Sequence, residues 1–447
     1  MSQPGHPGPG SQCRSILKLL ILYYWLRWKL GPRWRDRTQL LRWQARQLAR
    51  YARWLRRHSP YYRTLLEKGY TIDSFPEVDK KAFMAHFNAI NTVGIDRDQA
   101  MKLALKAERE EDGAAMLHGC AVGLSTGTSG NRGLFLASKR ERAEWAATMM
   151  HRVLRPGLRR QRIAFILRAN SQLYESIRSR LFEFRYYDLP RHLAPFLAEL
   201  NGYQPHVLTA QPSVLRLLAE AQQRGDLAIH PEQMVSYAEV LEPDDRQVIE
   251  STFGLTLTEV YQATEGFIAA TCAHGTLHLN EDIMRIERDY LSEGRFQPIL
   301  TDFRRRSQPV VRYRLNDILV EASESCPCGS PLQAIARIEG RMDDVFFLTG
   351  KQGKPVTIFP DWVRRCMVRS QDQAEDYVVC QTGPSDLSIY LSGLREGLAP
   401  LQAQMEAEWQ AFAEQKALQP LRLTFFAHLP TSTGIKRRRI IRSYADE

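Results

Sequence analysis

The sequence is poor in cysteine for its length and has no dense disulfide framework. Seven cysteines are scattered irregularly over 447 residues. Disulfide-stapled scaffolds are short and cysteine-rich, and an odd number of widely spaced cysteines does not fit that class. This excludes a small secreted disulfide domain. We therefore expect a reducing compartment, the cytoplasm.

The sequence also lacks a long uninterrupted hydrophobic run near its N-terminus. The apolar stretch ILKLLILYYWL at residues 16–26 is interrupted by Lys18. A membrane-spanning helix needs about 20 consecutive apolar residues. No small-residue cleavage site follows the stretch, so neither a membrane span nor a secretory signal is expected.

Acidic residues are nearly absent from the first 60 positions. This segment holds eleven Arg and two Lys against the single acid Asp36, and it contains five of the eight Trp. Two interpretations stay open: a pair of helices packed on the main domain with arginine facing water, or peripheral contact of residues 16–57 with the inner membrane surface. Since the whole chain carries +11, the remaining residues are nearly neutral, and no nucleic-acid partner is expected.

Beyond residue 115 the pattern alternates between strands and helices, which is typical of an α/β fold. Strands are expected at 162–168, 205–211, 234–241 and 257–264, and helices at 139–154, 213–223 and 244–253. The last hundred residues differ, because two neighbouring strands, a helix and a further strand predict a small α+β module. These are expected at 376–382, 386–393, 400–415 and 421–429, with the junction near 338–344.

One common phosphate-binding motif is missing, because the chain has no P-loop G-x-x-x-x-G-K-[ST]. The chain does have a loop rich in glycine and hydroxyl side chains, LSTGTSGNRGLFL at 124–136. Glycine permits positive φ and close approach of the backbone, so successive N–H groups can converge on a phosphate. A plain turn between two elements would also explain this loop on its own.

Several further motifs follow in order: SYAEVLEP, YQATEGF, HLNED, RYRLND, CPCG and GRMDD. With the glycine loop, this series resembles the adenylate-forming superfamily of acyl-CoA synthetases. It is most similar to the phenylacetate–coenzyme A ligase branch and, within that branch, to deazaflavin-coenzyme synthetase-like proteins. The resemblance spans roughly residues 58–447. Residues 1–57, which precede it, are expected to form a basic, Trp-rich helical extension. The resemblance implies an α/β fold with a large multi-subdomain adenylation domain of mixed sheets at 58–342. It also implies a small mobile α+β domain on a hinge at 343–447.

The resemblance also implies site residues for Mg·ATP. The β- and γ-phosphates would be held by Ser125, Thr126, Gly127, Thr128, Ser129 and Gly130. The adenine would be packed by Ala238, Glu239, Tyr261 and Gln262. Thr264 would donate to the α-phosphate, Glu265 would bind Mg²⁺, and Asp317 would accept from the ribose hydroxyls, roles that suit these side chains.

Three more residues are implied for the mobile domain and its junction. Arg341 precedes the hinge, Asp343 is the hinge residue, and Lys436 bridges the acyl carboxylate and the phosphate as charge moves. Lys436 lies in a basic run, and a solvated basic face is the alternative explanation. Three departures from the family pattern leave open a relative that binds nucleotide without turnover. The lysine that the family often has near position 133 is missing, Asn316 stands where glycine is usual, and Ile435 separates Gly434 from Lys436.

Three cysteines and one histidine match a structural zinc set. Cys326 and Cys328 form a C-x-CG loop, and Cys272 is followed by His274 and His278. Three Cys and one His make a closed tetrahedral Zn²⁺ site, for which we favour His278 over His274. Free buried thiols are the alternative.

The resulting functional expectation is ATP-dependent activation of a carboxylic acid, aromatic acids included, to an acyl-adenylate with release of pyrophosphate. The acyl group would then pass to coenzyme A or to the phosphopantetheine of an acyl-carrier protein. Nucleotidyl transfer to a coenzyme hydroxyl, a non-catalytic nucleotide-binding or membrane-associated relative, and a homodimer also stay open.

Overall fold

The computed structural model describes residues 9–31, 34–109, 115–125, 132–154, 160–166, 182–187, 193–367, 373–394, 397–430 and 438–444. The helices are α1 (Pro9–Leu30), α2 (Arg37–His58), α3 (Pro60–Glu67), α4 (Lys80–Ala85), α5 (Phe87–Ile90), α6 (Arg97–Arg109), α7 (Lys139–Arg152), α9 (Leu193–Tyr203), α10 (Pro212–Arg224), α11 (Pro243–Phe253), α12 (Pro360–Met367) and α13 (Leu398–Gln415). None of the helices in these ranges combines the length and apolarity that a membrane crossing needs.

The strands follow the same chain order. They are β1 (Ala115–Leu117), β2 (Cys120–Leu124), β3 (Leu134–Ser138), β4 (Gln161–Ile166), β5 (Phe182–Tyr187), β6 (Val207–Ala210), β7 (Gln233–Tyr237), β8 (Thr258–Ala263), β9 (Gly266–Thr271), β10 (Leu277–Leu279), β11 (Arg285–Ser292), β12 (Arg295–Asp302), β13 (Val310–Arg314), β14 (Asp317–Glu321), β15 (Ala334–Arg341), β16 (Phe346–Thr349), β17 (Pro355–Ile358), β18 (Asp376–Gln381), β19 (Asp386–Ser392), β20 (Arg422–Phe426) and β21 (Ile440–Arg442). They form sheets of three, twelve, two and four strands. This confirms the expected mixed α/β fold with a small α+β module at its C-terminal end.

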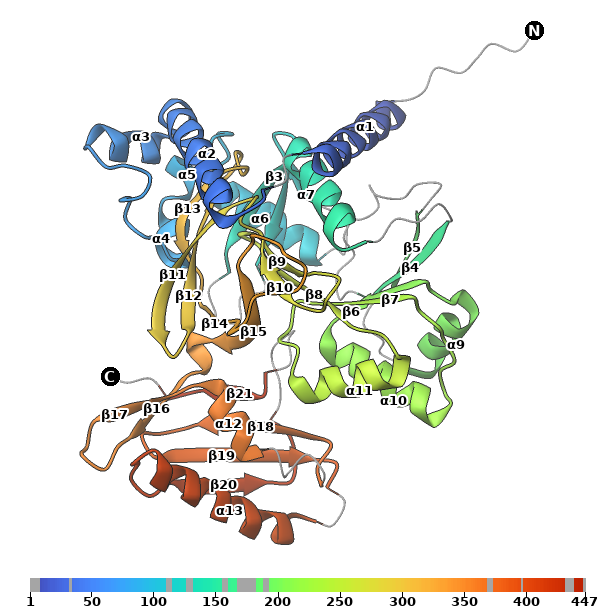
Figure 1. The fold of residues 1–447 in the computed structure, drawn as a ribbon, viewed down its shortest axis with the longest axis vertical. Helices are drawn as coiled ribbons and strands as arrows, with labels where there is room; N and C mark the ends of the chain where they lie inside the picture. Colours follow the sequence, from blue (N-terminus) through green and yellow to red (C-terminus); the bar gives the residue numbers. More distant parts are fainter. Residues whose placement is uncertain are drawn as a thin grey trace. The chain divides into compact units, whose positions relative to one another are not determined.

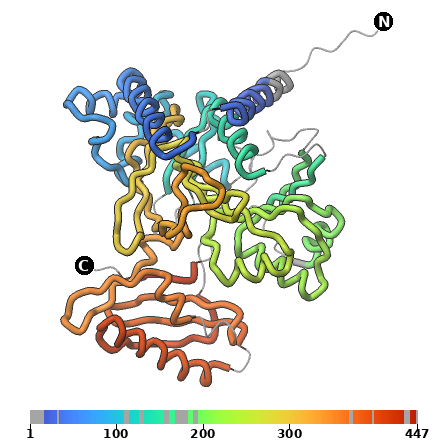
Figure 2. The backbone as a smooth tube through the Cα atoms, viewed as in Figure 1, coloured from blue at the N-terminus to red at the C-terminus, as the bar shows by residue number. Residues whose placement is uncertain are grey.

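The chain divides into two compact units. Unit 1 holds residues 1–315 and 320–337, and unit 2 holds 316–319 and 338–447. Figure 2 shows the path of the backbone through both. Each unit has its own buried core, so each is described separately below.

Unit 1 begins with helices, as the N-terminal pattern predicts. Asp36 caps α2 by accepting a hydrogen bond from the Gln39 backbone N–H at 2.8 Å. Ser59 is the break between α2 and α3, and Pro60 opens α3, where a missing N–H costs nothing. The chain therefore breaks between the two helices at Ser59.

The large sheet of unit 1 contains a parallel run. Strands β5, β4, β6, β7 and β8 are parallel neighbours, and β9 and β10 then continue the sheet in antiparallel fashion. Parallel neighbours require crossover connections, and helices α9, α10 and α11 supply them. Figure 1 shows these helices beside the sheet. The carboxyl ends of β7 and β8 consequently lie at one edge, where open α/β sheets bind ligands.

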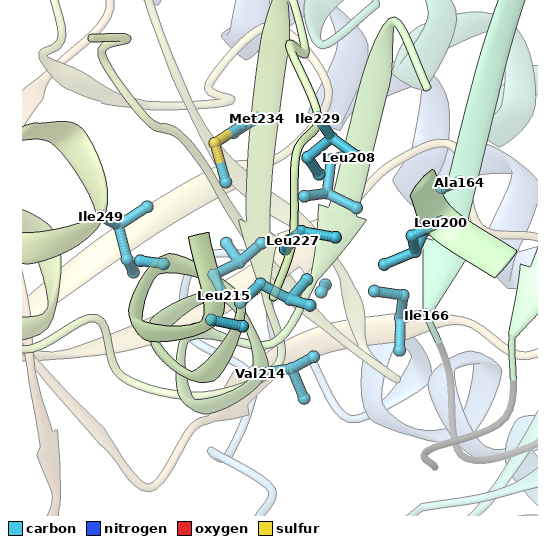
Figure 3. Packing of buried hydrophobic residues seen from close by; sticks show 14 of the residues in the cluster. Ala164, Ile166, Leu200, Leu208, Val214, Leu215, Leu227, Ile229, Met234 and Ile249 are labelled. Atoms are coloured by element: carbon cyan, nitrogen blue, oxygen red, sulfur yellow. The ribbon is translucent and has the colours of Figure 1, made fainter. Parts of the chain in front are cut away.

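The helix boundaries in this region follow from the sequence. Pro212 stands at the start of α10, and Gly225 ends it at φ +83°, a conformation that favours glycine. The inner face of α10 packs on the sheet through Leu215 and Leu218, both fully buried. Figure 3 shows part of this core, in which Leu215 and Met234 of β7 are among the labelled side chains. Burying a leucine side chain contributes roughly 1.5–3 kcal/mol, so this core holds the ligand-facing strand ends in place.

Unit 2 is built around the sheet β20-β19-β18-β21. Strands β18 and β19 are antiparallel, whereas β21 and β20 pair in parallel with β18 and β19 respectively. Helix α13 lies against this sheet with Trp409 fully buried in the core. The four elements expected from the last hundred residues are all present.

Candidate functional site

The glycine-rich loop connects two antiparallel strands of the three-stranded sheet, β2 and β3. Ser125 and Gly133 close its base: the Ser125 N–H donates to the Gly133 carbonyl, and the Gly133 N–H donates to Ser125 Oγ, both at 2.8 Å. The phosphate-binding candidates Thr126, Gly127, Thr128, Ser129 and Gly130 lie outside the described residues. The described part of the loop is therefore its base, which brings both loop ends together.

Two basic residues near this base behave differently. Arg132 forms an exposed ion pair with Glu108 of α6. Lys80, at the start of α4, packs over Gly133, because a Cβ added there would lie 3.0 Å from Lys80 Cε. Lys80 was not among the predicted site residues, and it is more than 40 positions upstream of the loop. No local pattern could have connected the two.

The second candidate segment is the turn between β8 and β9. Thr264 Oγ1 donates to Glu265 Oε2 at 2.8 Å, and Arg305 Nη1 donates to the Thr264 carbonyl at 2.6 Å. Arg305 also donates to the Leu136 carbonyl of β3 at 3.2 Å. A single guanidinium thus connects the Thr264 turn to the strand that follows the glycine loop. Arg305 was not among the predicted site residues.

The base of the glycine-rich loop and the turn between β8 and β9 line the same small cavity. Its volume is about 20 Å³, enough for roughly one water molecule, and its lining includes Lys80, Gly133, Thr264, Glu265 and Arg305. The structure therefore brings together two motifs that are 130 residues apart and adds two cations from elsewhere in the chain.

Beneath the turn lies a buried acid. Asp302, at the end of β12, is 4% exposed and accepts a hydrogen bond from the Arg304 N–H at 2.9 Å. Burial raises the pKa of Asp302 to about 6, although that hydrogen bond and the charges of Arg304 and Arg305 oppose the rise. A Cβ added at Gly266 would lie 3.6 Å from this carboxylate and 2.8 Å from Cε at the flexible end of Met284, so Gly266 lies directly beside Asp302.

The predicted adenine segments lie at the ends of neighbouring parallel strands. Ala238 and Glu239 follow β7, and Tyr261 and Gln262 are in the last part of β8, which pairs with β7. Ala238 has φ +68°, a conformation that costs a residue with a Cβ about 1 kcal/mol or more. Such strain is typical of ligand sites.

Side-chain contacts anchor both of these segments. Trp145 Nε1 donates to Gln262 Oε1 at 2.8 Å, and the Ser213 N–H donates to Glu239 Oε2 at 3.3 Å. Tyr237 donates from its hydroxyl to the Ile166 carbonyl at 2.5 Å. The four predicted adenine residues therefore share one sheet edge with the Thr264 turn.

Unit 2 carries the remaining described candidates. Arg341 Nε lies 3.4 Å from Asp317 Oδ1, so the predicted ribose acid and the residue before the hinge form an ion pair. Asp343 is half-buried in the 3-10 helix Met342–Asp344. Lys436 lies outside the described residues.

The next described residue after that gap, Arg438, forms an ion pair with Asp344. Burial raises the pKa of Asp344, and the Arg438 charge opposes this rise. This contact holds the chain just beyond Lys436 against the turn that contains Asp343. It was not predicted, because the two residues are 94 positions apart.

The Cys and His candidates come together in unit 1. The donor atoms of Cys272, His278, Cys326 and Cys328 all lie within 4.8 Å of one another. Cys272 Sγ is 3.6 Å from Cys326 Sγ, and Cys328 Sγ is 3.4 Å from His278 Nε2. His274 is not part of this group.

The donor set fits a tetrahedral metal ion. At a Zn–S distance of about 2.3 Å, two thiolates of a tetrahedron lie roughly 3.8 Å apart, close to the observed spacing. His278 Nδ1 lies 3.0 Å from the Leu332 carbonyl, and donation to that carbonyl leaves Nε2 as the acceptor facing the thiols. These residues therefore fit Zn²⁺ in donor type and in the two donor distances given above.

Comparison with known proteins establishes the fold. No family model and no curated protein sequence matches the chain. Solved structures do: 2-hydroxyisobutyryl-CoA ligase in the postadenylation state, in complex with 2-HIB-AMP, matches with a TM-score of 0.65 and 18% identity over 89% of this chain and 88% of that one. An open conformation of that ligase, in complex with 2-HIB-AMP and CoA, matches with a TM-score of 0.55 and 18% identity over 91% of both chains.

A third match extends the comparison to another activity. The amide bond synthetase McbA from Marinactinospora thermotolerans has a TM-score of 0.50 and 14% identity over 70% of this chain and 67% of that one. The chain thus has the fold of adenylate-forming ligases. The finer resemblance to the phenylacetate–coenzyme A ligase branch and to deazaflavin-coenzyme synthetases stays a prediction.

Proposed function

We propose that the protein is an adenylate-forming ligase that activates a carboxylic acid with Mg·ATP and transfers the acyl group to a thiol. The observation that carries this proposal is the shared cavity of the glycine-loop base and the Thr264–Glu265 turn. The fold supports it, because two of the matched structures contain 2-HIB-AMP and one of these also contains CoA.

The chemistry explains why these groups belong together. Attack of a carboxylate on the α-phosphorus of ATP joins two anions, so the barrier is lowered mainly by positioning and by neutralising charge. Loop N–H groups and hydroxyls would bind the phosphates, and Lys80 and Arg305 would add positive charge beside them. Glu265 would hold Mg²⁺, which screens the phosphate oxygens when bound. Among the described residues, its carboxylate accepts one hydrogen bond, from Thr264, and so retains an oxygen for a metal.

Unit 2 would supply the remaining groups. Asp317 would accept from the ribose hydroxyls, with Arg341 holding its carboxylate by the ion pair described above. Rotation at Asp343 would move the 343–447 domain relative to the 58–342 adenylation domain between half-reactions. Lys436 would bridge the acid and the α-phosphate during adenylation.

The first test is pyrophosphate release from Mg·ATP across a panel of aliphatic and aromatic carboxylic acids. We expect release that depends on one class of acid and falls by roughly 10²–10³-fold in Lys436→Ala. Lys351→Ala, an exposed lysine of the same unit, is the matched control and should be unaffected. If no acid gave pyrophosphate release while ATP still bound, the proposal would be contradicted and the protein would be a nucleotide-binding protein. Release that needs a hydroxyl compound instead would indicate nucleotidyl transfer.

We further propose that Cys272, His278, Cys326 and Cys328 hold a structural Zn²⁺. The donor distances and the orientation of His278 support this assignment. All four positions of the tetrahedron are filled by protein atoms, so the ion would stabilise the β9–β10 turn and the CPCG loop rather than take part in the reaction.

A further inference from the structure

Helix α1 exposes an apolar face. Of the eleven large hydrophobic side chains exposed among the described residues, six lie on this one helix. They are Ile16, Leu19, Leu22, Tyr23, Leu26 and Leu30. Because they recur every three or four positions, they share one side of the helix. An apolar surface concentrated in this way marks an interaction site, whereas single exposed leucines need no explanation.

The opposite face of α1 is held against α7. Ile21 and Tyr24 are buried there, and Trp28 Nε1 donates to Thr148 Oγ1 at 2.7 Å. Arg140 Nε donates to the Tyr24 hydroxyl at 2.6 Å. Figure 1 shows α1 beside α7. These directional contacts determine the rotation of α1, so its leucine face is presented outward.

Helix α2 exposes a row of arginines. Its buried residues are Leu40, Gln44, Leu48, Tyr51 and Leu55. At 3.6 residues per turn, the side opposite to them carries Arg42, Arg46, Arg50, Arg53 and Arg57, all exposed. The helix contains no acidic residue, and the structure records no ion pair between these arginines and a described acid. The row is therefore an uncompensated positive stripe.

A groove connects the two helices. Its volume is about 780 Å³, and α1 and α2 both line it, with Trp25, Trp28, Trp34 and Trp43 among the lining residues and Arg50 at its α2 side. Trp34 and Trp43 pack against each other with ring centroids 4.9 Å apart. Tryptophan and arginine are the side chains favoured at the boundary between lipid and water.

We propose that α1 and α2 dock this protein on the surface of a bilayer that contains anionic phospholipid. The leucine face would enter the boundary between headgroups and acyl chains, and the arginine row would lie over the lipid phosphates. An anionic bilayer surface matches both the leucine face of α1 and the arginine row of α2. A second copy paired through α1 would bury the leucines but bring two strongly positive segments together, and a nucleic acid would use the arginines without covering the leucines. The inference does not depend on the proposed reaction.

Vesicle co-sedimentation of the full chain tests the proposal. One set of vesicles is phosphatidylcholine alone, and the other contains about 25% phosphatidylglycerol, both near physiological ionic strength. We expect binding to the anionic vesicles only. Leu19→Glu/Leu22→Glu and, separately, Arg42→Glu/Arg46→Glu/Arg53→Glu should each lower the partition coefficient by roughly tenfold or more.

A matched control separates the surface from net charge. The variant Lys102→Glu/Lys351→Glu/Lys354→Glu changes the total charge by the same amount as the arginine variant, but at exposed positions elsewhere. It should change binding by less than about twofold. Unchanged thermal unfolding verifies that the variants fold. Equal binding to neutral and anionic vesicles, or equal loss in the control, would overturn the proposal. So would a dimer in solution that the Leu19→Glu/Leu22→Glu variant abolishes, since a second copy would then cover the leucine face.

Discussion

Strand β9 carries two candidate sites of opposite character, one at each end. At its start, the Thr264–Glu265 turn borders a cavity to which α4, the loop base at Gly133 and the segment after β12 all contribute. At its end, Cys272 closes on a histidine and two cysteines within 4.8 Å. The first site leaves charged groups facing a space, whereas the second directs its donors at one another.

This difference indicates what each end is suited to do. A reaction needs groups with spare hydrogen-bonding or coordination capacity, and Glu265 retains it. A structural metal site needs the reverse, a full set of protein donors with no open position. Since six residues separate Glu265 from Cys272 along one strand, substitutions at the two ends should affect different properties, activity at one and stability at the other.

The largest effect is expected for Glu265→Gln. Glutamine keeps an oxygen to accept from Thr264 but loses the charge that would bind Mg²⁺, so acid-dependent pyrophosphate release should fall by roughly 10²–10³-fold. The melting temperature should stay within about 2 °C, since the substitution removes no packing. Glu324→Gln, at an exposed acid of unit 1, is the control. Retention of most activity in Glu265→Gln would show that this end of β9 is not the reaction site.

Cys328→Ser should do the opposite. We expect purified protein to contain about one zinc per chain, and the variant to lose most of it together with at least about 3 kcal/mol of stability. Turnover by the folded fraction should stay within about twofold, because a closed site takes part in no step. His274→Ala is the matched control, an exposed histidine just outside the cluster. Full zinc content in Cys328→Ser would exclude the proposed ligand set, which metal analysis and thermal unfolding can decide.

Asp302 offers a pH test at the first end of β9. Burial raises its pKa from 3.8 to about 6, so between these values the folded chain holds a proton that the unfolded chain has released. Stability contributed by this group therefore falls as pH rises from about 4 to about 6, by up to roughly 3 kcal/mol. In Asp302→Asn that loss should disappear, so the melting temperature of the variant should rise relative to that of the wild type as pH increases. Parallel melting-temperature curves from pH 4 to 7 would contradict this, and Asp226→Asn, at an exposed acid, should give such parallel curves.

The sequence predicted helices and strands better than it predicted which distant residues meet at a site. The helix expected at 139–154 and the strands expected at 234–241 and 257–264 correspond to α7, β7 and β8, because the patterns that predict them lie within a few residues. The Cys and His set was also predicted, although Cys272 and Cys326 are 54 positions apart, because the weak C-x-C spacing was joined by the family resemblance. Lys80, Arg305 and the Arg438–Asp344 pair were missed. Each is an ordinary charged residue whose role depends on which distant strand ends the fold brings next to it.

The smallest effect we expect tests one of these missed residues. Lys80→Met keeps the stem that packs over Gly133 but removes the charge beside the loop, so KM for ATP should rise by roughly tenfold while kcat changes little. Lys81→Met changes the neighbouring, exposed lysine of the same helix and should leave KM unaltered. Equal KM values in the two variants would mean that Lys80 only packs against the loop. A tenfold difference in KM between the two variants would instead show that Lys80 of α4 supplies positive charge to the site beside the Thr264–Glu265 turn. Lys80 would then take the place of the lysine missing at position 133.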